Sequence, residues 1–179
     1  MRRAYIGMGG NLASAAGAPE ATLAAAVRRL ESLGCVVCRS PLYSTAPIGL
    51  SGQPRFVNAV VEVATELAAR ELLAGLLAIE QEFGRDRSAG IANGPRTLDL
   101  DLLLMDELEV SEPGLELPHP RLAERAFVLV PLNEIAAQRI VPGRGKTVAE
   151  LLAGLPASAE NAPNAVVRIE YDGWRARKG

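Results

Sequence analysis

The sequence predicts an α+β fold in which helices pack against one antiparallel sheet. Apolar patterns along the chain follow the order strand, helix, strand, strand, helix, strand, which is the βαββαβ order of a ferredoxin-like sandwich. A length of 179 residues, of which 49% are hydrophobic, allows one domain with a substantial core. We therefore predict a single domain over residues 1–179 that consists of this ferredoxin-like unit and C-terminal additions.

Local signals place each element. Pro19 suits the first turn of a helix and Gly34 suits its end, and a second apolar stripe at helical spacing ends just before Gly84. The predicted elements of the unit are strand 3–8, helix 19–33, strand 35–44, strand 55–64, helix 68–83 and a strand over 98–105. After this unit we predict a short helix over 147–155 with Thr147 as its N-cap, a strand over 165–171 and a loose tail over 172–179.

The two cysteines form a single Cys-x-x-Cys on the predicted strand 35–44. Cys35 and Cys38 have no second cysteine pair to join, and the chain contains one histidine, so a zinc site is not indicated. Their odd spacing puts the two thiols on opposite faces of a regular strand. We predict buried, reduced cysteines.

Charge and composition exclude several classes of protein. A net charge of −2 and a pI near 5.6 argue against a dedicated nucleic-acid binder, which usually has a strongly basic face. The residues after Met1 do not form a signal peptide, and no apolar run is long enough to cross a bilayer. We expect a monomeric cytoplasmic enzyme that acts on small molecules, without nucleic acid or membrane partners.

The stretch from Gly94 to Met105 carries the clearest chemical signal. Asp99 and Asp101 are two residues apart on a predicted strand, so they share a face and lie about 7 Å apart. Two carboxylates at this spacing repel each other unless a cation lies between them, and Mg²⁺ prefers one or two carboxylates together with water and substrate phosphates. Arg96 comes just before the pair and can meet the same phosphates. The alternative interpretation is that the two aspartates belong to the solvated face of an edge strand.

Several further motifs match one known family. They are Tyr5–Leu12, Tyr43–Gly49, Phe56–Ala59, Gly84–Arg87, Gly94–Asp101, Pro118–His119 and Arg125–Leu132. Through them the chain, over about residues 4–155, resembles the 6-hydroxymethyl-7,8-dihydropterin pyrophosphokinase family of folate biosynthesis. The resemblance implies transfer of the pyrophosphoryl group of ATP to the pterin hydroxymethyl group, with release of AMP, on a ferredoxin-like fold with two Mg²⁺ ions.

The resemblance also implies a role for individual residues. The expected metal ligands are Asp99 and Asp101. The expected pterin pocket consists of Thr45, Pro47, Ile48, Phe56, Asn58 and Phe127. Expected contacts with the nucleotide or its phosphates come from Glu80, Arg85, Arg87, Arg96, Leu102, His119 and Arg125. Among these residues, those expected to act in catalysis are Arg85, Arg87 and Arg96, which would take up phosphate charge, and Asp101 is a candidate general base. The chain departs from some relatives at Asn93, where they have tryptophan, and at Leu77, where they have a polar residue.

These roles are physically sensible for the residue types. A pterin is a flat heterocycle with a polar edge, so the rings of Phe56 and Phe127 can lie against its faces and the amide of Asn58 can meet its edge. Phe56 and Asn58 share one face of the predicted strand 55–64. The alternative interpretation is that both phenylalanines belong to the ordinary core.

Two other functions fit parts of the sequence. One is a different Mg²⁺-dependent kinase or phosphohydrolase, which would release ADP or free phosphate from ATP in place of AMP. The other is an RRM-like RNA-binding module, because that module has the same ferredoxin-like topology. Against the second, no segment matches the aromatic RNP pattern, and aromatic residues make up 4% of the chain.

Overall fold

The computed structural model of the protein describes residues 1–49, 52–85, 94–158, 160–162 and 164–174. The main elements in chain order are β1 (Arg2–Gly10), α1 (Pro19–Leu30), β2 (Cys35–Arg39), β3 (Leu42–Thr45), β4 (Phe56–Thr65), α2 (Ala69–Glu82) and β5 (Asp99–Met105). They are followed by β6 (Val110–Glu112), β7 (Leu115–Leu117), η1 (Leu122–Glu124), α3 (Ala126–Ala136), β8 (Ile140–Val141), β9 (Lys146–Thr147), α4 (Val148–Ala153), β10 (Val166–Ile169) and η2 (Asp172–Trp174).

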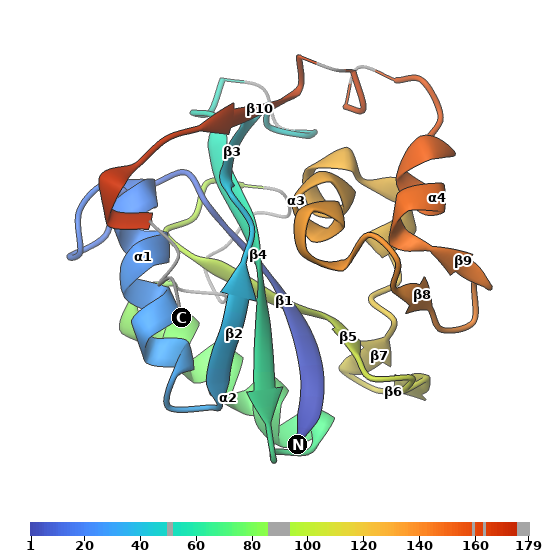
Figure 1. Ribbon diagram of the computed structural model, residues 1–179. Coiled ribbons are helices and arrows are strands. Elements are labelled where there is room, and N and C mark those ends of the chain that lie inside the picture. Colours follow the sequence, from blue (N-terminus) through green and yellow to red (C-terminus); the bar gives the residue numbers. More distant parts are fainter. Residues whose placement is uncertain (50–51, 86–93, 159, 163, 175–179) are drawn as a thin grey trace.

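The sheet has the antiparallel character that the sequence predicts. Its strand order is β10-β3-β4-β1-β5, with β2 also paired to β4, and every pairing is antiparallel. Helices α1 and α2 cover one face, α3 covers the other, and α4 packs against α3 (Figure 1). The ferredoxin-like α+β sandwich with C-terminal additions is therefore confirmed. In an RRM-like module the face opposite the two helices is the RNA platform, and here α3 packs against that face.

Side-chain alternation along β4 and β5 divides the molecule into two cores. Val57, Ala59, Val61 and Val63 point to the core under α1 and α2, and Val60 points to the core under α3. On β5, Leu100 and Leu102 join the first core, which leaves the two aspartates on the face of α3. Every residue of β4 is buried, because both faces of this central strand are covered.

The predicted strand over 35–44 is two strands. The break is at Ser40–Pro41, where proline has no N–H for the ladder. Ser40 bridges the break, since its N–H donates to the carbonyl of Val60 at 2.9 Å and its hydroxyl accepts the Val60 N–H at 3.0 Å. β2 and β3 consequently pair with successive parts of β4.

The prediction of two buried cysteines is wrong for Cys35, which is exposed, and Cys38 is partly buried. An irregularity in the pairing with β4 separates them. The Cys38 thiol donates to Oε2 of Glu62 at 3.3 Å. Burial, together with this carboxylate, raises the pKa of Cys38 to about 12, so the thiol stays protonated.

The C-terminal end differs from the predicted loose tail. Trp174 is buried, and its indole N–H donates to the carbonyl of Ser40 at 2.8 Å. The guanidinium of Arg39 lies 5.1 Å from the centre of the Trp174 ring. Burial of a large aromatic surface holds residues 172–174 in place, and residues 175–179 lie outside the described part. The helix over 148–153 has the predicted cap, in which the Thr147 hydroxyl accepts the Glu150 N–H at 3.2 Å.

No helix of the described residues is long and apolar enough to cross a membrane.

Candidate active site

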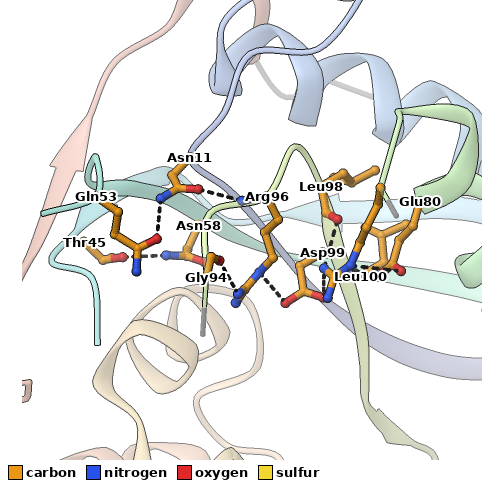
Figure 2. Close-up of polar contacts among 11 residues, drawn as sticks. Asn11, Thr45, Gln53, Asn58, Glu80, Gly94, Arg96, Leu98, Asp99 and Leu100 are labelled. Carbon is orange, nitrogen blue, oxygen red and sulfur yellow. Dashed lines mark hydrogen bonds and ion pairs between the residues drawn. The ribbon is translucent and has the colours of Figure 1, made fainter. Parts of the chain in front are cut away.

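One wall of the candidate site comes from neighbouring residues of β3 and β4. Thr45 pairs with Phe56 across the two strands, which puts both side chains on the face of α3. Asn58 shares that face, and its amide donates to the Thr45 hydroxyl at 2.6 Å (Figure 2). The Asn58 amide group is therefore held in one orientation.

The opposite wall comes from the start of α3. Phe127 lies in the first turn of this helix, two residues after Arg125, which occupies the N-cap position. A cavity opens between the two walls, and its lining contains Thr45, Ala46, Ile48, Phe56, Asn58, Arg96, Arg125 and Phe127. Five of the six predicted pterin-pocket residues thus lie together. Pro47, the sixth, lies beside them in the chain but is not in this lining.

Each aromatic ring of the cavity has an arginine over it. The guanidinium of Arg96 is 4.9 Å from the centre of the Phe56 ring, and that of Arg125 is 5.3 Å from the centre of the Phe127 ring. Stacked in this way, the planar guanidinium groups are held at the cavity and keep donors available for anions.

The carboxylates of β5 open onto an adjoining cavity. Its lining includes Asp99 and Asp101 and shares Asn58, Arg96, Arg125 and Phe127 with the aromatic cavity. The predicted metal ligands and the predicted pterin pocket therefore belong to one continuous site. This proximity is the arrangement that the sequence interpretation required.

Glycines on β1 leave the space above the sheet open. Gly7 pairs with Asp101 and Gly9 pairs with Asp99, so these two positions share the face of the carboxylates. A Cβ atom on Gly9 would lie 2.5 Å from the side-chain oxygen of Asn58. The sequence analysis did not identify these glycines as functional. Their signal was a small residue at every second position of a buried strand.

Asp99 is paired with two arginines. Its carboxylate contacts Nη1 of Arg85. Nε of Arg96 lies 3.0 Å from its Oδ2 (Figure 2). Both arginines were predicted from the sequence, and the structure brings them to the carboxylates. Arg87 and Asn93 lie outside the described residues.

Asp101 experiences a different environment. Burial, the charge of Asp99 and the charge of Glu80 together raise the pKa of Asp101 from 3.8 to about 7, against the opposing effect of Arg96 and Arg85. Excess negative charge at this point is what a divalent cation neutralises. The described residues contain no group of three or more side chains that could hold a metal ion. A cation at this point would therefore depend on Asp99 and Asp101, with its other ligands coming from water or substrate.

Glu80 and Leu102, two of the predicted nucleotide contacts, are not in the lining of either cavity. Glu80 is 1% exposed; its carboxylate accepts the Leu100 N–H at 2.7 Å and lies 3.7 Å from Nε of Arg85. It thus supports β5 and Arg85 from the buried side. The Leu102 side chain belongs to the core under α1 and α2, since it points away from the aspartate face. Leu77, on the same helix as Glu80, is partly buried.

His119 and Asn11 make hydrogen bonds to segments that carry the site. The His119 N–H donates to the Leu103 carbonyl at 2.9 Å, and its Nδ1 accepts the Arg121 N–H at 3.2 Å. Burial and the charge of Arg125 lower the pKa of His119, so the ring is neutral at pH 7. Asn11, which the sequence analysis did not single out, is buried, and its side chain accepts the Arg96 N–H at 2.9 Å and donates to Gln53 at 3.0 Å (Figure 2). The signal available in the sequence was an amide side chain directly after an apolar strand, where such a group needs hydrogen-bond partners if it is buried.

Comparison with known proteins identifies the family that the sequence motifs resemble. A family model described as 7,8-dihydro-6-hydroxymethylpterin-pyrophosphokinase (HPPK) matches residues 5–137. The 2-amino-4-hydroxy-6-hydroxymethyldihydropteridine pyrophosphokinase of Pseudomonas aeruginosa is 44% identical over 156 residues, which is 87% of this chain and 93% of that protein. The protein of the same name from Methylorubrum extorquens is 42% identical over 172 residues, which is 95% of this chain and 100% of that protein.

A solved structure shows the same fold. It is the Plasmodium falciparum HPPK-DHPS wild type crystallised with pteroate, with a TM-score of 0.66 and 14% sequence identity. The match covers 84% of this chain and 43% of the longer Plasmodium chain.

Proposed function

The chain belongs to the 7,8-dihydro-6-hydroxymethylpterin-pyrophosphokinase family, and we propose that its pterin and nucleotide meet in the cavity between β4, β5 and α3. The protein is a pyrophosphokinase of folate biosynthesis, which transfers the pyrophosphoryl group of ATP to the hydroxymethyl group of 6-hydroxymethyl-7,8-dihydropterin. The observation that carries the proposal is the continuity of the aromatic cavity with the Asp99–Asp101 pair.

The pterin would lie between the rings of Phe56 and Phe127. Because Asn58 donates to Thr45 through its amide nitrogen, its oxygen is the atom available to accept from the amino edge of the heterocycle. The hydroxymethyl group would then point along the shared lining toward Asp101. Pro47 and Ile48 would close the pocket from the loop after β3.

Asp99 and Asp101 would hold Mg²⁺. Held by these two carboxylates, Mg²⁺ would supply positive charge that favours the charged phosphates and the deprotonated form of the attacking hydroxyl group. Arg85 and Arg96 now neutralise Asp99, so they would exchange this carboxylate for phosphate oxygens as nucleotide and Mg²⁺ arrive. Arg87, Arg125 and His119 would contribute further donors to the phosphates, and Asp101 stays a candidate general base. A contact between the nucleotide and the Leu102 backbone also stays a prediction.

Product analysis by mass spectrometry tests this site. With ATP, Mg²⁺ and hydroxymethyldihydropterin, we expect the wild type to form AMP and a pterin diphosphate in equal amounts, whereas ADP or free phosphate would indicate a different kinase or a phosphohydrolase. Asp99→Ala should lower the rate by at least about 100-fold, because several kcal/mol of charge stabilisation are lost. Glu66→Ala is the matched control, since Glu66 is exposed in the turn after β4, at the end of the strand opposite Phe56. Full activity in Asp99→Ala would refute the proposed metal site.

A monomeric state, a cytoplasmic location and independence of nucleic acid stay predictions from composition and charge.

A further inference from the structure

A C-terminal strap lies beyond the part of the chain that the family model matches. The strap consists of residues 160–162 and 164–174, and the family match ends at residue 137. After α4 the chain crosses over the start of α3 and reaches the outer edge of β3 (Figure 1). There β10 pairs with β3 over Val166–Ile169, and the buried Trp174 anchors the far end.

The strap supplies a cap for the helix that carries Phe127. Helix α3 has Arg125 at its N-cap position, and an arginine side chain has no acceptor for the first helical N–H groups. Oδ1 of Asn161 takes this role across 35 residues of chain, because it accepts the Ala126 N–H at 3.1 Å. The Asn161 amide nitrogen donates to the Pro156 carbonyl at 3.2 Å, which orients the side chain. Ala126 lies between Arg125 and Phe127, which both line the cavity.

The same strap also holds the opposite wall. The Ala165 carbonyl accepts the Ala46 N–H at 3.1 Å and an N–H of Arg55 at 3.3 Å. Ala46 lines the cavity, and Arg55 directly precedes Phe56. Asn161 therefore contacts the helical wall, and Ala165, four positions later in the chain, contacts the sheet wall.

We propose that the strap sets the distance between the two walls of the pterin cavity, and that Asn161 is a positioning residue for Phe127. This inference rests on the proposed function of the cavity. Asn161 does not touch the substrate; it acts through the first turn of α3. Loss of its acceptor leaves the Ala126 N–H without a partner, so the first turn of α3 loosens and Phe127 is no longer held in a fixed position in the cavity lining.

Steady-state kinetics of Asn161→Ala, measured well below its unfolding temperature, tests the inference. We expect KM for hydroxymethyldihydropterin to rise about fivefold, which corresponds to about 1 kcal/mol, the usual value of a helix N-cap. Asn161→Asp loses the amide donor to Pro156 but keeps an acceptor for the Ala126 N–H and adds negative charge at the helix N-terminus, which offsets that loss, so it should restore KM to within about twofold of the wild type. Asn164→Ala removes an exposed amide from the same strap and should leave KM unchanged.

Thermal unfolding and the fluorescence of Trp174, the chain's single tryptophan, accompany the kinetics. An unchanged emission spectrum in Asn161→Ala shows that the far end of the strap is still docked. A lowered unfolding temperature with an unchanged KM would mean that Asn161 is merely structural and would overturn the inference. An Asn161→Asp variant as impaired as Asn161→Ala would overturn it too, because the acceptor would then be irrelevant. If the wild type and Asn164→Ala both form product, the proposed function holds, and a failure of the Asn161 predictions counts against the role of the strap alone. A wild type that forms no product would refute the proposed function, and this inference with it.

Discussion

Replacing Asp101 with asparagine should stabilise the metal-free protein at pH 8 while removing most of its activity. The substitution keeps the size and shape of the side chain and removes its charge. In the metal-free site this charge is unfavourable, because burial and the charges of Asp99 and Glu80 raise the pKa of Asp101 from 3.8 to about 7. The same charge is needed when Mg²⁺ binds.

The size of the effect follows from that difference in pKa. A pKa difference of about three units, at about 1.4 kcal/mol per unit, sets an upper limit of roughly 4 kcal/mol on the increase in the free energy of unfolding that the substitution causes at pH 8. This difference already includes the attraction of Arg96 and Arg85; because the asparagine amide is itself a polar group that is costly to bury, we expect about half of this value. For a domain of this length, about 2 kcal/mol corresponds to a rise of roughly 4–8 °C in the unfolding temperature.

The sign of the pH dependence distinguishes this cause from others. Because the pKa is raised in the folded state, the stabilisation by the protonated carboxyl group is complete below about pH 4 and is lost as the pH rises to about 7. The wild type and Asp101→Asn should therefore have similar stability at pH 4, and the variant should be the more stable one at pH 8.

Thermal unfolding in a metal chelator at the two pH values is the assay, with Glu66→Gln as a control for loss of one exposed negative charge. Addition of Mg²⁺ and an ATP analogue should then raise the unfolding temperature of the wild type more than that of the variant. If Asp101→Asn is no more stable than the wild type at pH 8 without metal, the reasoning about repulsion in the empty site is wrong.

Two further predictions concern the supports of the site. Glu80→Ala should lower the free energy of unfolding by about 3 kcal/mol, because the Leu100 N–H and Arg85 lose a buried acceptor; denaturant unfolding measures this, and Glu82→Ala on the exposed side of α2 is the comparison. A loss below about 0.5 kcal/mol would contradict the supporting role of Glu80. Phe127→Leu should raise KM for the pterin about fivefold and change KM for ATP less than twofold, since a ring contact contributes about 1 kcal/mol. Equal increases in both KM values would mean that Phe127 does not contact the pterin selectively.

The core of the candidate site could be predicted from short, local patterns. Alternation along a strand was enough to put Asp99 and Asp101 on one face, and the same rule put Phe56 beside Asn58. These predictions depend only on the two-residue period of a strand. The burial of the Glu80 and Leu102 side chains could not be predicted, because a family match assigns a position in the sequence but does not give the depth of a side chain in the core.

Contacts between distant segments could not be predicted in this way. Nothing near Ala126 in the sequence indicates that Asn161 accepts its N–H, and the polar residues around Trp174 suggested a loose end. Asn11 and Gly9 have the same character, since each owes its role to a neighbour more than 40 residues away.

The sequence by itself determined the α+β class, the order of the main elements and the family, because apolar period, turn residues and motifs are properties of contiguous stretches. Only the tertiary structure decided which groups are buried behind the site and which face it. It also decided how Asp99 is neutralised before ligands arrive and how the end of the chain joins the two walls. These features depend on distances between residues far apart in the chain, and such distances exist only after the sheet has brought β3, β4, β5 and α3 together.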